Sequence, residues 1–137
     1  MKIATLSVVI CSVSAVLADK PSGFHAADSE INHQRFMSRV SLAEIHLKWS
    51  PDSRETPPLS PGRAQAIARK QLEYVVPSGQ KWYVEAIRII DGHEHRDWLC
   101  EIAFRREYPS NVAVFDGDRM NILVLMDGTP VKPKRIP

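Results

Sequence analysis

The clearest periodic pattern in the chain is a helical one that begins after Ser60-Pro61. Apolar residues recur every three or four positions, as on one stripe of an amphipathic helix, at Ala64, Ile67, Ala68, Leu72 and Val75. Ser60 can cap the first turn, and Pro61 suits the first helical position because its missing N–H would have no partner there. Pro77-Ser78-Gly79 ends the run. The sequence therefore predicts one helix, whose alanines allow close approach to a sheet.

Three later segments have the alternation or the β-branched and aromatic content that is typical of strands. They cover residues 81–90, 98–105 and 120–126, and one row of the second holds Trp98, Cys100, Ile102 and Phe104. Residues 112–115 can add a short strand before Asp116-Gly117. Asp127-Gly128 predicts a tight turn close to the end of the chain.

An earlier segment, residues 41–49, admits two interpretations. Apolar residues alternate along it with a period of two, which fits a half-buried strand, at Ala43, Ile45, Leu47 and Trp49. A helix stays open as the alternative, because Phe36, Val40, Ala43 and Leu47 also fall at helical spacing. The stop at Ser50-Pro51 favours the strand. Residues 50–62 contain four prolines and are expected to form a connection.

Taken together, these elements predict an α+β fold in the order β-α-β-β-β. One helix would pack on a curved antiparallel sheet of about four strands, in two layers around one core. The expected division is a signal peptide at 1–18, a flexible lead-in at 19–40, a single domain at 41–131 and a basic tail at 132–137. The lead-in is inferred from its mixture of Pro, Gly, Ser and charge, and the Lys-Pro-Lys-Arg tail is typical of a solvated end.

Four motifs in this order carry a resemblance to a known family. The runs LSPGRAQAIARKQL, KWYVEAIRI, WLCEIAFR and ILVLMDGTPV resemble the PepSY-type domain over about residues 59–131. With the preceding strand, the whole is similar to the wider cystatin-like arrangement. The resemblance implies a secreted or periplasmic binding module, which in some relatives modulates peptidases. The insertion REYPSNVAVFDGDR departs from the family pattern, and the inhibitory Q-x-V-x-G loop of cystatins is not found.

The first residues are typical of a secretory signal peptide. Lys2 precedes an uncharged run, residues 3–18, that ends in small residues, and cleavage is expected after Ala18. An uncleaved anchor is disfavoured because the run is shorter than the roughly 20 residues of a membrane span. Acylation of Cys11 stays an alternative, although Ile10 fits lipoprotein processing poorly. We therefore expect a secreted or periplasmic protein with no stable membrane span.

Charge and cysteine content exclude further classes. The chain of 137 residues has 18 basic and 16 acidic side chains, without the basic excess that nucleic-acid binders show. Loss of the signal peptide would leave Cys100 as the single cysteine, so no internal disulfide is expected. Cys100 also lies in an apolar row, which argues against a reactive thiol.

The segment DGHEHRDWLC, residues 91–100, gathers the candidate metal ligands. In an extended segment His93, His95 and Asp97 would point to one side, so a three-ligand zinc site is geometrically possible. However, the segment joins two strands, and Asp91-Gly92 supplies turn chemistry. The sequence therefore favours a solvated hairpin tip, with no metal or cofactor, and leaves these three residues as the metal candidates.

No catalytic residues are predicted. There is no G-x-S-x-G nucleophile motif, and Asp116-Gly117-Asp118 lacks the remaining ligands of a calcium loop. The aromatic residues Trp49, Trp82, Trp98, Tyr83 and Phe104 are interpreted as core anchors rather than a ligand platform. The sequence thus predicts a non-enzymatic binding module for a peptide or protein. The alternatives are a metal or small-ligand function at His93 and His95, and a small hydrolase or isomerase with a cavity between helix and sheet.

Overall fold

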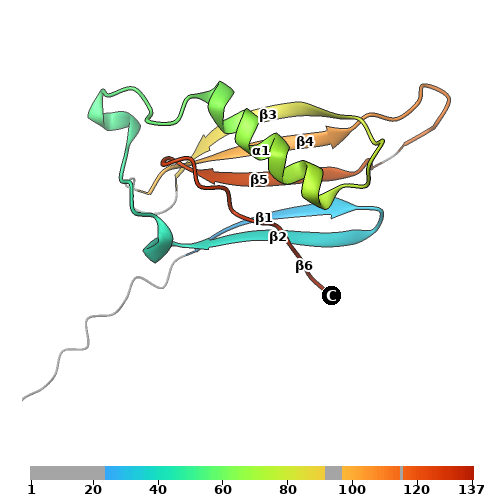
Figure 1. Ribbon diagram of the computed structural model, residues 1–137, viewed down its shortest axis with the longest axis horizontal. Helices are drawn as coiled ribbons and strands as arrows, with labels where there is room; N and C mark the ends of the chain where they lie inside the picture. The colour runs from blue at the N-terminus through green and yellow to red at the C-terminus, as the bar shows by residue number, and fades with distance from the viewer. Residues whose placement is uncertain (1–23, 92–96, 115) are drawn as a thin grey trace, which may run out of the picture.

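A computed structural model describes residues 24–91, 97–114 and 116–137 as one helix on an antiparallel sheet (Figure 1). Its elements are β1 (Phe24–Ile31), β2 (Gln34–Ser41), α1 (Pro61–Val75), β3 (Trp82–Ile90), β4 (Leu99–Arg106), β5 (Arg119–Leu125) and β6 (Lys134–Arg135). The strands lie in the order β3-β4-β5-β1-β2-β6. The α+β class is confirmed, but the sheet has six strands rather than about four.

Helix α1 forms where the pattern predicts it. The hydroxyl of Ser60 accepts a hydrogen bond from the N–H of Arg63 at 3.3 Å, and Pro61 occupies the first turn. The helix lies diagonally across β4 and β5 (Figure 1). Its stripe of Ala64, Ala68 and Leu72 is buried, which confirms the predicted contact face.

Strands β3, β4 and β5 confirm the three later predictions and carry the main core. Cys100, Ile102 and Phe104 on β4 pack with Met120, Ile122 and Val124 on β5, beneath the alanines of the helix. Nearly every side chain of this layer is fully buried. The layer between helix and sheet is therefore a dry apolar core.

The predicted flexible lead-in at 19–40 is wrong for the described part of that range. Residues 24–41 form the hairpin of β1 and β2. Three of its five described buried positions carry small side chains, Ala27, Ser29 and Ser38, and only Ile31 and Val40 are large, so the alternation is weak on a hydropathy scale. The turn at Asn32 and His33 has φ values of 49° and 61°. Two successive left-handed residues match the twist of a two-residue hairpin, but an Asn-His pair is a poor sequence signal for one.

Residues 41–49 are neither the predicted strand nor the alternative helix. Strand β2 ends at Ser41, and a single 3-10 turn follows at Leu42–Glu44. The Glu44 carboxylate accepts the N–H of Ser41 at 2.7 Å, which ends the strand ladder there. Trp49 keeps an isolated bridge to Asp97. Residues 112–114 are also not a strand.

The predicted solvated tail is also corrected. Lys134 and Arg135 form β6 and pair with Met37 and Phe36 of β2, and the N–H of Ile136 donates to the carbonyl of Arg35 at 3.0 Å. The signal peptide and Cys11 lie outside the described residues, as do His93 and His95. Within the described ranges, no helix has both the length and the apolar character of a membrane span.

Candidate functional site

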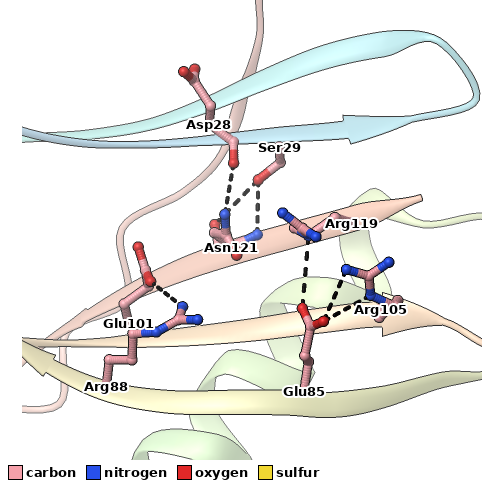
Figure 2. Close-up of polar contacts among 8 residues, drawn as sticks. All are labelled: Asp28, Ser29, Glu85, Arg88, Glu101, Arg105, Arg119 and Asn121. Atoms are coloured by element: carbon pink, nitrogen blue, oxygen red, sulfur yellow. Dashed lines mark hydrogen bonds and ion pairs between the residues drawn. The ribbon is translucent and has the colours of Figure 1, made fainter. Parts of the chain in front are cut away.

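The face of the sheet opposite α1 carries a ladder of paired charges (Figure 2). Arg88 on β3 donates to Glu101 on β4 at 2.8 Å. Glu85 accepts from Arg105 at 2.9 Å, and Arg119 on β5 lies 3.7 Å from the same carboxylate. Glu85 lies at a β-bulge between Val84 and Ala86, and such bulges redirect side chains. The charges are matched within this part of the face, and beside them Leu99, Leu123 and Leu125 are buried in a second apolar cluster with Val40, Leu42 and Ile45.

A second polar group, centred on Asp118, fixes the loop between β4 and β5. Its carboxylate accepts the N–H of Asn32 at 2.8 Å and a guanidinium N–H of Arg106 at 3.0 Å. Partial burial opposes ionisation, but these two donors outweigh it and hold the pKa of Asp118 below its usual value. The Tyr108 hydroxyl accepts the N–H of Asp118 at 2.9 Å. The loop is therefore tied both to the end of β4 and to the β1–β2 turn.

This loop, β3 and the end of β4 line an open hollow of about 410 Å³ with both polar and apolar walls, here called the Tyr83 hollow. Its lining includes Tyr83, Arg105, Tyr108, Pro109, Val112 and Val114. Among the described residues six large hydrophobic side chains are exposed, and three of them, Tyr83, Val112 and Val114, line this hollow. A cluster of exposed apolar side chains marks an interaction surface more often than isolated ones do.

The wall of the Tyr83 hollow depends on a close contact at Gly117. A Cβ atom at this position would lie 3.1 Å from the ring of Tyr108 and 3.3 Å from Val114. On its other side, the Tyr108 ring stacks under the guanidinium of Arg106, 4.8 Å from the ring centroid. Tyr108, Val114 and Gly117 thus form a packed wall.

Strand β3, which contributes Tyr83, is also an edge of the sheet. It is nine residues long, and no described strand pairs with its outer side. The opposite edge is the two-residue β6, whose Lys134 and Arg135 protect it from further pairing. Alternate residues of β3 direct their N–H and C=O groups away from β4. The edge is therefore a template for an additional strand, next to the Tyr83 hollow.

A further hollow of about 330 Å³ lies beside the first and shares Gly117 with it. Its charged lining residues have both signs, and the ion pair between Arg35 and Asp28 is long, at 3.8 Å, with both side chains more than half exposed. Exposed pairs of this kind contribute little. This hollow has no feature that selects a ligand class.

Of the three metal candidates, the structure describes Asp97 alone, which is buried and bonded to the ammonium group of Lys48. It is the one buried carboxylate among the described residues. Its charge is already compensated. His93 and His95 lie outside the described residues, within which no group of three potential ligands could hold a metal ion.

The aromatic residues divide between the two faces of the sheet. Trp49, Trp82 and Phe104 are buried core residues, as predicted. Cys100 is 1% exposed, and burial raises the pKa of its thiol, which confirms its place in the core row. Tyr83, which the sequence also predicts to be a core residue, lies instead on the opposite face, paired with Arg105. The alternation along β3 predicts that Tyr83 lies on the face opposite Trp82. It cannot predict the loop between β4 and β5 that lies beside Tyr83, because that loop is distant in sequence.

Comparison of the chain with protein-family models, with curated proteins and with solved structures found no match.

Proposed function

We propose that the protein is a binding module for an extended peptide segment, which adds as a strand to the outer edge of β3. The observation that carries this proposal is that a nine-residue edge strand, with no described strand on its outer side, lies next to a hollow where the exposed side chains of Tyr83, Val112 and Val114 gather. In strand addition, main-chain hydrogen bonds supply affinity and pockets for alternate side chains supply specificity. The Tyr83 hollow would receive one apolar side chain of the peptide.

The bulge at Glu85 defines how the peptide can bind. Regular pairing of β3 with β4 is interrupted between Val84 and Ala86, which strengthens the local twist. The bulge and the charged Arg88 disfavour indefinite edge-to-edge pairing of protein copies. A single short peptide can follow the twist on either side of the bulge. The edge is thus suited to a transient ligand strand.

The resemblance of residues 59–131 to PepSY-type domains supports the same class of function, a modulator of a peptidase or of another envelope protein. The signal-like segment at residues 1–18 supports export to a secreted or periplasmic location. In such a setting, the ligand would be a segment of another exported protein.

Selection from a random peptide library displayed on phage tests the proposal, with binding of the selected peptides measured by calorimetry. Burial of an aromatic ring contributes roughly 1.5–3 kcal/mol, so Tyr83→Ser should weaken binding about tenfold or more. Tyr74→Ser is the matched control, because Tyr74 is 84% exposed on the helix and should bind as the parent does.

Hydrogen exchange then locates the peptide. Strand addition should slow exchange of the outward-directed amides of β3 in the complex. The proposal fails if the library yields no binding peptide, if both tyrosine variants bind equally, or if selected peptides leave the exchange of β3 unchanged.

A further inference from the structure

The edge of the sheet opposite β3 holds a second candidate site, which the proposed peptide function does not use. A groove of about 420 Å³ lies over β2 and the carboxyl-terminal strand. Its lining includes Met37, Arg39, Glu44, Lys132, Lys134 and Ile136. A neighbouring hollow of about 400 Å³ shares Arg39, Glu44 and both lysines, and adds His46 and the carboxylate of Asp127. One set of basic side chains therefore serves two adjoining depressions.

The cations are held together by backbone pairing. Met37 pairs with Lys134, and the N–H of Ile136 donates to Arg35 at 3.0 Å, so the chain end is fixed along β2. Side chains two residues apart on a strand share a face, which brings Lys132 and Lys134 to the same side. The two lysines thus lie beside Arg39 on an ordered strand pair. Because the backbone is already ordered, less conformational entropy is lost when a ligand binds.

The groove has an excess of positive charge, with three cations to one carboxylate among its lining residues. That carboxylate, Glu44, accepts the N–H of Ser41 at 2.7 Å. Among the described residues, neither Lys132 nor Lys134 forms an ion pair within 4.0 Å of a carboxylate oxygen. The hydrogen bonds from Ser41, and to a smaller extent the charge of Lys134, lower the pKa of Glu44, and both ammonium groups keep N–H donors for an added anion.

The remaining lining residues are partly apolar. Met37 and Ile136 are half-buried. Met37 pairs with Lys134 across the two strands, and Ile136 is two residues after Lys134 in the chain. An ion without an apolar part would leave these side chains in contact with water. A chain attached to the anion would cover them. The combination of cations and apolar walls matches an anionic head on an apolar body.

From this charge complementarity we infer that the groove binds a phosphorylated amphiphile. The phosphate would lie among Arg39, Lys132 and Lys134, and the apolar chain against Met37 and Ile136. Charge-assisted hydrogen bonds to phosphate oxygens would hold the head group. Burial of the chain would supply affinity that inorganic phosphate lacks.

Calorimetric titration of the protein with hexyl phosphate tests this inference, with inorganic phosphate and hexyl glucoside as the probes that lack the chain and the charge. Hexyl phosphate should bind with a Kd below about 1 mM, and both other probes at least roughly tenfold more weakly. The double variant K132Q/K134Q should lose at least about tenfold in affinity for hexyl phosphate. K70Q/K81Q removes the same charge from exposed positions elsewhere and should bind as the parent does.

The outcomes separate the parts of the inference. Equal binding of hexyl phosphate and inorganic phosphate would overturn the amphiphile class, and equal binding of hexyl glucoside would overturn recognition of charge. Unchanged affinity in K132Q/K134Q, or no binding of hexyl phosphate to the parent, would overturn the site. Thermal unfolding of both double variants checks that the fold is kept.

Discussion

The Ser29 hydroxyl accepts a hydrogen bond of 2.8 Å from the backbone N–H of Asn121, 92 residues later in the chain. The Asn121 side chain returns a bond of 2.8 Å to the carbonyl of Asp28 (Figure 2). Ser38 on β2 approaches the Asn121 carbonyl at 3.4 Å. Regular pairing of β1 with β5 is confined to Glu30 and Arg119. Side-chain hydroxyls therefore take over much of the role of a strand ladder at this junction.

Replacement of Ser29 by alanine should destabilise the protein by about 1–3 kcal/mol, because the partly buried N–H of Asn121 would lose its acceptor. Urea unfolding measures the change in free energy. Ser78→Ala removes a hydroxyl from the exposed turn after α1 and should change it by less than about 0.5 kcal/mol. Equal effects of the two substitutions would contradict the role given to Ser29.

The ion pair between Lys48 and the buried Asp97 should also contribute to stability. Lys48→Met would leave a carboxylate that is 10% exposed without its cation, at a cost of about 1–3 kcal/mol. A double-mutant cycle with Asp97→Asn should give a coupling energy of at least about 0.5 kcal/mol. Lys70→Met on the exposed side of α1 is the control. A coupling energy of zero would show that the pair is incidental.

Asp118 should make stability depend on pH in the acid range. Its pKa is lower in the folded chain than the ordinary value of roughly 3.9, so its contribution is complete above that value. The contribution is lost as pH falls through the folded pKa. The difference in free energy of unfolding between the parent and Asp118→Asn should therefore be larger at pH 7 than at pH 2. A difference independent of pH would contradict this assignment.

The β1–β2 turn should be improved by a single substitution. His33 has a φ of 61°, a conformation that glycine adopts without steric cost, and its side chain is fully exposed. His33→Gly should raise the free energy of unfolding by about 0.5–1 kcal/mol. Gln34→Gly, one residue later in extended backbone, should lower it by a similar amount. The same sign for both changes would contradict the turn geometry.

Helix α1 and strands β3 to β5 follow from local patterns in the sequence. Ser60 and Pro61 define the helix start, and the alternation around Cys100 separates the core row from the open face. Large apolar side chains at regular spacing can be buried in one way only, so the pattern alone predicts these elements. Cys100 lies in the core, as its place in the apolar row predicts.

Only the tertiary structure decided the rest of the sheet and the candidate sites. Ser29 and Ser38 are buried because Asn121 offers backbone groups that match their hydroxyls, a partnership between residues too distant for any local pattern to report. Lys134 and Arg135 form a strand because β2 offers an edge. The Tyr83 hollow likewise exists because the loop that carries Val112 and Val114 lies beside Tyr83. A hydropathy pattern predicts burial from the size and polarity of each side chain alone. The serine junction, strand β6 and the Tyr83 hollow depend instead on contacts between residues that are distant in the chain.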